Sequence, residues 1–252
     1  MFTRKTIGTF FELGGRAAME CLTRTGLDYV VIDTEHNCFT PEQTAYYIQA
    51  AENGGLLPYV RIGDVRRPYV LQMLDIGARG LIVPNIKSVS EAESLVSSAK
   101  FPPLGNRGYC LNRTSGWGVD PWAQDVGTYM EVCNRRCKLV PQCETKEALE
   151  VIEEITALPG VDGIFVGPCD LSIALGVPLE LESPVLLRAI DRILLACKDH
   201  GKGSIMFTMD PDSVSYWLHC GFDSVVCGMD TSFLMRGYQS IVDATRDALQ
   251  MQ

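Results

Sequence analysis

The sequence has few basic residues and no long hydrophobic run. Of its 252 residues, 22 are Lys or Arg and 31 are Asp or Glu, so the formal net charge is −9 at pH 7. A nucleic-acid surface needs clustered Lys and Arg to neutralise phosphates, and this balance argues against one. The chain lacks any stretch of about 18 uninterrupted apolar residues, and its start lacks a signal-peptide core. We therefore expect a cytoplasmic protein that acts on small molecules, without a nucleic-acid or membrane partner.

Disulfide and zinc patterns are also missing. The chain has ten cysteines, but no two of them form a CxxC pair. Cys133 and Cys137 share a CxxxC spacing that suits one face of a helix, and the sequence offers no further ligands for a zinc site there. We therefore expect reduced, partly buried thiols rather than a disulfide framework.

The chain does contain a regular alternation of apolar and amphipathic segments. Hydrophobic residues make up 46% of it and charged residues 21%, which is ordinary globular usage. Near-continuous apolar runs such as YVVI and GLIV are typical of strands that are covered on both faces. Eight such runs occur, at residues 6–13, 29–36, 58–62, 80–86, 138–144, 163–168, 203–207 and 224–229.

Segments with helical spacing follow most of these runs, and several open with Ser, Thr, Asp or Pro and close at Gly. They lie at residues 41–54, 90–100, 145–160, 183–201 and 210–221. Eight strand–helix units without a linker predict an α/β fold, a single (β/α)8 TIM barrel over residues 1–252. The Gly- and Pro-rich segment 101–128 interrupts the rhythm, and we expect it as a loop over the active site or at a subunit contact.

Polar side chains gather where the predicted strands end, which is where a barrel carries its chemistry. These ends supply Asp33, Glu35, His36, Arg61, Gln142, Glu144 and residues 167–170. Glu144 and Asp170 follow neighbouring strands, and two carboxylates placed in this way suit a hard divalent cation. Solvated or helix-capping acids are the alternative interpretation of the same pair.

The remaining charged groups leave several interpretations open. Arg61 fits either a salt bridge in the barrel mouth or a group that binds a carboxylate or a developing oxyanion. His36 fits either acid–base catalysis or a structural role. His200 and His219 lie near the ends of predicted helices and are expected to be structural. By its pattern alone, Asp75 is a surface or capping acid.

Seven segments of the chain resemble, in order and spacing, the HpcH/HpaI aldolases over about residues 5–240. They are VVIDTEH, YVRIGD, LDIGARGLIVP, FPPLGNRG, PQCETKEAL, LPGVDGIFVGPCDLSIALG and VVCGMDTSFL. The resemblance implies a class II aldolase, a lyase that reversibly cleaves a 4-hydroxy-2-oxo acid to pyruvate and an aldehyde. The family includes 4-hydroxy-2-oxoheptanedioate and 2-dehydro-3-deoxyglucarate aldolases.

The resemblance also implies a metal site and a pyruvate pocket. Glu144 and Asp170 would ligate a divalent ion, Mg²⁺, Mn²⁺ or Co²⁺, with waters and substrate at the remaining positions. Gln142 and the backbone around Gly167 and Pro168 would line the pyruvate pocket, together with Asp170.

Further roles follow from the same resemblance. Arg61 would bind the keto oxygen and the enolate, and His36 would be the general base with Asp75 as its orienting partner. Asp33 matches another family acid with an auxiliary role. Family members form dimers that pack into hexamers by exchanging the last helix, here about residues 231–250, whose amphipathic pattern permits the exchange. We therefore expect a homo-oligomer whose substrates are a keto acid and an aldehyde.

Three alternatives stay open. A Schiff-base aldolase would need a lysine at the mouth, and Lys87 is the candidate. The metal–enolate site would also serve oxaloacetate decarboxylation or condensation of the enolate with another acceptor. The third is a non-catalytic barrel that binds a keto acid. Cys143, Cys169 and Asn85 depart from the family pattern and leave the identity of the aldehyde open, and the two thiols predict sensitivity of the site to oxidation or to soft metals. The pathway and the preferred metal also stay open.

Overall fold

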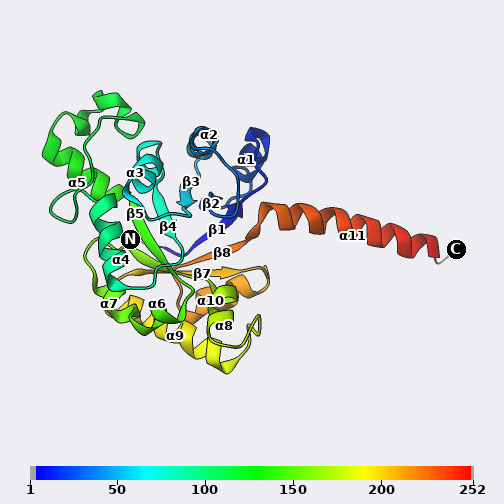
Figure 1. The fold of residues 1–252 in the computed structure, drawn as a ribbon. Coiled ribbons are helices and arrows are strands. Elements are labelled where there is room, and N and C mark those ends of the chain that lie inside the picture. The colour runs from blue at the N-terminus through cyan, green and yellow to red at the C-terminus, as the bar shows by residue number, and fades with distance from the viewer. Residues whose placement is uncertain (1–3, 251–252) are drawn as a thin grey trace.

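The strands predicted from the sequence close into one barrel. The computed structural model describes residues 4–250. Eight parallel strands pair in sequence order and the last returns to the first, which confirms the (β/α)8 TIM barrel (Figure 1). The strands are β1 (Thr6–Phe11), β2 (Tyr29–Asp33), β3 (Leu57–Arg61), β4 (Gly80–Val83), β5 (Lys138–Cys143), β6 (Gly163–Val166), β7 (Gly203–Thr208) and β8 (Ser224–Met229).

Helices alternate with the strands and cover the outside of the barrel. They are α1 (Arg16–Leu22), α2 (Pro41–Asn53), α3 (Arg67–Asp75), α4 (Val89–Ala99), η1 (Arg113–Gly118), η2 (Pro121–Ala123), α5 (Val126–Arg136), α6 (Lys146–Glu150), α7 (Ile152–Ala157), α8 (Pro168–Ala174), α9 (Pro184–Asp199), α10 (Ser213–Cys220) and α11 (Asp230–Gln250). The helix predicted at 145–160 is divided at Val151, whose backbone leaves the helical region at ψ 22°. The expected helices otherwise differ from the observed ones mainly at their ends.

Each strand buries both of its faces. In β2, Val31 points into the barrel and packs with the inner cluster, whereas Val30 and Ile32 pack outward against the helices. Alternate side chains of a strand point to opposite faces, so a strand that is covered on both sides needs an unbroken apolar run. This requirement explains why the strand positions could be predicted. The inner cluster fills the barrel up to Phe10 and Phe165, beneath its carboxyl end.

A capping box fixes the loop that carries Glu35 and His36. The Thr40 side chain accepts a hydrogen bond from the Gln43 backbone at 3.2 Å, and the Gln43 side chain accepts one from the Thr40 backbone at 2.9 Å. The two bonds satisfy donors at the start of α2 that have no partner inside the helix. They set where the loop after β2 must rejoin the helix.

The segment 101–128 does not lie over the carboxyl end of the barrel, so that expectation is wrong. It follows α4 and leads through η1, η2 and α5 into β5, so its chain ends meet the barrel at the amino-terminal side of the strands. Arg107 in this segment donates to Asp75 at the end of α3, at 2.8 Å. Figure 1 shows the excursion as the green part that stands away from the barrel. The alternative expectation, a subunit contact, stays a prediction.

The last helix leaves the barrel. Figure 1 shows α11 projecting beyond β1 and β8, and residues 233–249 are all exposed. Phe233, Leu234, Met235, Tyr238 and Ile241 are among the apolar side chains that it exposes. No helix within residues 4–250 is long and apolar enough to cross a membrane.

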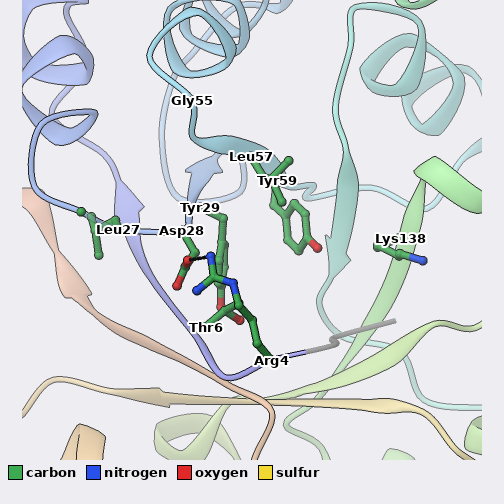
Figure 2. A pocket seen from close by; sticks show the side chains of 10 residues that line it. Arg4, Thr6, Leu27, Asp28, Tyr29, Gly55, Leu57, Tyr59 and Lys138 are labelled. Atoms are coloured by element: carbon green, nitrogen blue, oxygen red, sulfur yellow. Dashed lines mark hydrogen bonds and ion pairs between the residues drawn. The ribbon is translucent and has the colours of Figure 1, made fainter.

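A cavity of about 530 Å³ opens at the amino-terminal end of the barrel. Figure 2 shows Arg4 paired with Asp28 there, beside Tyr29 and Tyr59 and near Lys138. Arg4 and Asp28 precede their strands, and Tyr29 and Lys138 begin theirs, so the cavity lies opposite the end at which barrel enzymes carry their active sites. We assign it no part in the chemistry.

Candidate active site

Asp33 and Arg61 meet because the strands that carry them run side by side. The parallel ladder of β2 and β3 pairs Asp33 directly with Arg61, the last residue of each strand. Arg61 Nε donates to Asp33 Oδ1 at 2.9 Å, and Arg61 Nη2 donates to Asp33 Oδ2 at 2.7 Å. A fork of this kind fixes the guanidinium plane as well as its position.

The pair is buried. The side chain of Asp33 is 0% exposed and that of Arg61 is 12% exposed. The guanidinium carbon also lies 4.5 Å from the centre of the Phe10 ring, so Arg61 rests on the apolar filling of the barrel. Burial lowers the pKa of Arg61, but the hydrogen bonds and charge of Asp33 outweigh it and raise the pKa above its usual value. Arg61 is therefore a fixed positive charge at the mouth.

Glu35 joins Arg61 to His36, a role that the sequence did not reveal. Glu35 Oε2 lies 3.4 Å from Arg61 Nε and 3.6 Å from His36 Nε2. Its backbone N–H donates to Asp33, at 3.0 Å. Burial raises the pKa of the Glu35 carboxyl, and the positive charges of Arg61 and His36 oppose the rise. The signal was present as an acid beside His36, but nothing in the spacing showed which way the side chain would turn.

Glu144 lies in a cradle of donors. Its Oε1 accepts the backbone N–H of Asn85 at 2.6 Å, and its Oε2 accepts from the Gln142 side chain. Asn85 has a positive φ of 58°, which Asn tolerates better than most residues. Burial raises the pKa of the Glu144 carboxyl; the two donors lower it, and the charges of Asp170 and Glu35 raise it again.

Gly167 allows β6 to approach this cradle. A Cβ at Gly167 would lie 2.9 Å from Gln142 Nε2 and 3.2 Å from Glu144 Oε2, so a larger residue would displace these two groups. Gln142 is 3% exposed, and among residues 4–250 its Oε1 finds no hydrogen-bond partner. Helix α8 begins at Pro168, directly after Gly167. Asp170 lies in its first turn and is exposed. Glu144, Gln142 and the turn before Asp170 thus share one corner of the mouth.

The two unusual thiols differ in position. Cys143 belongs to the core layer between the strands and the helices, where burial raises its pKa to about 12. It therefore turns away from the mouth, and the idea that it sensitises the site to oxidation is wrong. Cys169 is partly exposed beside Asp170. All ten cysteines are free, as expected, and residues 4–250 hold no group of three or more His, Cys, Asp or Glu side chains suited to a metal.

Within one chain, Asp75 is not brought to His36. Asp75 ends α3, and this helix runs from the mouth back to the start of β4, so Asp75 lies at the far end of the barrel. Its Oδ1 accepts from Arg107 at 2.8 Å and from Asn112 at 3.0 Å. His36 is 68% exposed, and its charged neighbour is Glu35. A single chain therefore does not bring Asp75 to His36, because the helix that ends at Asp75 leads back to the amino-terminal end of the barrel.

The other expected positions are simple to describe. Lys87 is exposed on the loop before α4. His200 follows the last residue of α9, and His219 lies in the last turn of α10, as expected for structural histidines.

Comparison with known proteins agrees with this geometry. Residues 6–236 match the family model described as HpcH/HpaI aldolase/citrate lyase. A 2-keto-3-deoxy-L-rhamnonate aldolase of Klebsiella pneumoniae is 32% identical over 227 residues, which cover 89% of this chain and 83% of that protein. The protein of the same name in Escherichia coli K12 is 32% identical over 84% of this chain and 78% of its own length.

Solved structures give the same result. The HpcH/HpaI aldolase of Desulfitobacterium hafniense DCB-2 is 28% identical with a TM-score of 0.90, and covers 96% of this chain and 93% of its own. The citrate synthase SbnG is 26% identical with a TM-score of 0.87, over 98% of this chain and 95% of that one. With barrel, mouth and sequence in agreement, the chain belongs to the HpcH/HpaI aldolase/citrate lyase family.

Proposed function

We propose that this chain, an aldolase-type lyase by family, uses a divalent metal ion to cleave a 4-hydroxy-2-oxo acid reversibly to pyruvate and an aldehyde. The observation that carries the proposal is the buried Arg61–Asp33 fork beside the Glu144 cradle, at the carboxyl end of the barrel. The fixed guanidinium of Arg61, together with a Glu144 carboxylate placed to hold a metal ion, suits a reaction in which negative charge develops on one oxygen.

The donor set of the mouth fits a hard cation. Burial and the nearby charge of Asp170 both raise the pKa of the Glu144 carboxyl, which means that both destabilise its ionised form. A bound cation would stabilise the ionised form against both effects. The two carboxylates would hold the ion, with Gln142 beside them. A bound divalent ion would supply Lewis-acid stabilisation of the negative charge on the pyruvate enolate.

The chain's own residues do the rest. Arg61 binds the keto oxygen and stabilises the enolate charge, held at its position by Asp33. Gln142, Gly167 and Pro168 line the pyruvate end of the substrate. The apolar floor that includes Phe10 excludes water from beneath the reacting carbons.

His36 is the proposed general base, which removes the proton of the C4 hydroxyl directly or through a water. Glu35 is its observed neighbour, and the rate contribution of such a base is typically about 10²–10⁴-fold. We expect His36→Ala to keep metal binding and to lower aldol cleavage far more than oxaloacetate decarboxylation, which removes no hydroxyl proton. An equal loss of both activities would show that the base is wrongly assigned.

Metal dependence is tested with a matched pair of variants. Mn²⁺ binding by calorimetry and aldol cleavage with Mg²⁺, Mn²⁺ or Co²⁺ are measured for Glu144→Gln and for Glu147→Gln, whose exposed acid lies three residues on. We expect Glu144→Gln to weaken Mn²⁺ binding by at least about 100-fold. Loss of a residue that only supports a metal ligand typically weakens binding by about 10–100-fold, and loss of a ligand itself should cost at least as much. Glu147→Gln should behave as wild type. Full activity after chelation, or pyruvate trapped on Lys87 by borohydride, would refute the metal mechanism.

The substrate class follows from the relatives. Cleavage of 2-keto-3-deoxy-L-rhamnonate between C3 and C4 would release pyruvate and lactaldehyde, so lactaldehyde is the first aldehyde to test. Succinic semialdehyde, tartronate semialdehyde and glycolaldehyde complete the screen. The likeness to a citrate synthase supports one alternative, in which the enolate condenses with another acceptor. A screen without aldol turnover, but with a condensation product of pyruvate and a keto-acid acceptor, would favour that alternative.

We also propose a dimer-based homo-oligomer in which α11 covers a second copy. The exposed stripe of Leu234, Tyr238, Ile241 and Leu249 follows helical spacing along one face. The helix leaves its own barrel after hydrogen bonds from the Glu12 and Leu13 backbones to Asp230. Apolar side chains on a helix that its own barrel does not cover are typical of a subunit contact.

A further inference from the structure

Arginines from separate segments gather on the amino-terminal side of the barrel. Arg79 precedes β4, Arg113 lies in η1 and Arg136 ends α5. The three line one open pocket of about 430 Å³, which we call the arginine pocket. The whole chain has a net charge of −9, so three guanidinium groups in one hollow run against the overall balance. A site for an anion is the first function to consider.

Two acids, Glu52 and Asp120, line the same pocket, so three guanidinium groups face two carboxylates and are compensated only in part. Glu52 Oε1 accepts from Arg79 Nε at 3.0 Å, and Glu52 Oε2 pairs with Arg113 Nη2 at 2.6 Å. A guanidinium has five N–H donors, so both arginines keep donors to spare. Within residues 4–250, Arg136 forms no ion pair, and its guanidinium lies 4.9 Å from the centre of the Trp122 ring. Burial and the charge of Arg79 lower the pKa of Arg136, so these like charges repel each other.

A smaller hollow adjoins this pocket and shares Arg79 and Arg136 with it. It measures about 30 Å³, and Arg107 also lines it, whereas no acid does. Arg107 is 7% exposed; one of its Nη groups donates to Asp75, but within the described chain its Nε finds no acceptor. A buried donor without an acceptor destabilises the fold unless a ligand supplies the missing acceptor. A hollow of this size accommodates a single oxygen atom.

The rim of the arginine pocket carries Trp117. Its side chain is 71% exposed, and its backbone has φ 53°, a left-handed conformation that is uncommon for a bulky residue. The turn η1 therefore holds a flat apolar surface beside the guanidinium groups. This combination suits a ligand with a charged end and a carbon skeleton.

We propose that the arginine pocket binds a phosphoryl group, carried by a small phosphate ester, at a site remote from the barrel mouth. Three guanidinium groups from three separate segments can donate to several oxygens of a tetrahedral phosphoryl dianion, whereas a carboxylate offers only two. One oxygen reaches toward Arg107 in the inner hollow, and the organic part lies against Trp117. The site goes beyond the aldolase function and needs neither its metal nor its substrate.

The test uses the full chain without metal or substrate, at constant ionic strength set with chloride. Inorganic phosphate and phenyl phosphate are titrated by calorimetry into wild type, Arg136→Gln and Arg135→Gln. Arg135 is the neighbouring control, an exposed arginine paired with Glu131 on the same helix. We expect saturable binding to wild type and Arg135→Gln, and a dissociation constant raised at least about ten-fold in Arg136→Gln, equivalent to about 1.4 kcal/mol. Tighter phenyl phosphate binding assigns an ester, and tighter inorganic phosphate binding assigns the free anion.

Several outcomes would overturn the proposal. Equal affinities for Arg135→Gln and Arg136→Gln would show unspecific binding, and loss of binding in Arg61→Ala would place the anion at the mouth instead. A changed oligomer mass of Arg136→Gln, measured without phosphate, would make the pocket a subunit contact. If Arg136→Gln fails to fold, the wild-type tryptophan fluorescence decides: a saturable change with phosphate and none with chloride supports the site, and no change refutes it.

Discussion

The Asp33–Arg61 fork gives the sharpest quantitative prediction. In Asp33→Asn the side-chain volume is kept, but the amide can present only one acceptor where the carboxylate presents two. Its NH₂ group then faces an N–H of Arg61, and Arg61 stays buried without the charge that compensates it. Breaking a buried pair in this way costs about 3–5 kcal/mol. Because Glu35 still lies 3.4 Å from Arg61, we expect the lower end of that range.

The expected stability loss is large enough to measure. At about 2–4 °C per kcal/mol for a chain of this length, a loss near 3 kcal/mol lowers Tm by about 6–12 °C. Misorientation of Arg61 should also reduce kcat/KM for aldol cleavage by about 100-fold or more. Thermal unfolding is compared at equal protein concentration, since oligomers gain stability with concentration.

The matched control is Glu153→Gln. Glu153 holds Arg192 in the same two-bond fork, at 2.8 and 2.7 Å, but both side chains are about half exposed. An exposed pair contributes about 0–1 kcal/mol, so this control should change Tm little and activity not at all. If Asp33→Asn unfolds at the wild-type temperature, or if both variants lose the same stability, burial is not what makes the Asp33–Arg61 pair important.

Three further predictions concern the surroundings of the mouth. Burial, followed by the charge of Asp33, raises the pKa of Glu12 from 4.5, so ionisation of Glu12 destabilises the folded state as the pH rises through the raised pKa. Glu12→Gln should therefore raise Tm at pH 8, and melting curves at lower pH should show this gain shrinking toward pH 5. Iodoacetamide at pH 8 should label exposed Cys38 but spare Cys143 and Cys197, whose pKa burial raises to about 12, and mass spectrometry would contradict this by finding all three labelled. Ile241→Asp should dissociate the oligomer in light scattering, and an unchanged mass would remove α11 from the contact.

The sequence predicted the barrel because its strands are buried on both faces. Runs such as residues 80–83 have no polar position to obscure them, and parallel order then brings all strand ends to one mouth. The meeting of Asp33 with Arg61 follows from register alone, since each is the last residue of its strand. For residues on strands and directly after them, the sequence therefore also predicted the end of the barrel at which they lie.

Positions on helices and long loops were harder to predict. Asp75 and the segment 101–128 both lie between a helix and the next strand, and such a connection returns to the amino-terminal end of a barrel. Similarity of motifs does not reveal which end of its own barrel a residue occupies, so the partnership of Asp75 with His36 was expected, although within one chain the two residues lie at opposite ends. Glu35 was placed at the mouth, but its link between Arg61 and His36 was missed, because these contacts depend on a side-chain direction that a short loop sets.

The mouth is costly to fold, and this cost is informative about the reaction. Burial raises the pKa of Glu35, of Glu144 and of Glu12, so the surroundings of these three carboxyls disfavour their ionised form. A buried ion pair such as Arg61–Asp33 rarely stabilises a fold more than apolar residues of similar size would. What it does supply is a positive charge whose position needs no adjustment when an oxyanion forms. A barrel that only bound a keto acid would gain little from that rigidity, whereas an enzyme that stabilises an enolate gains it in every turnover.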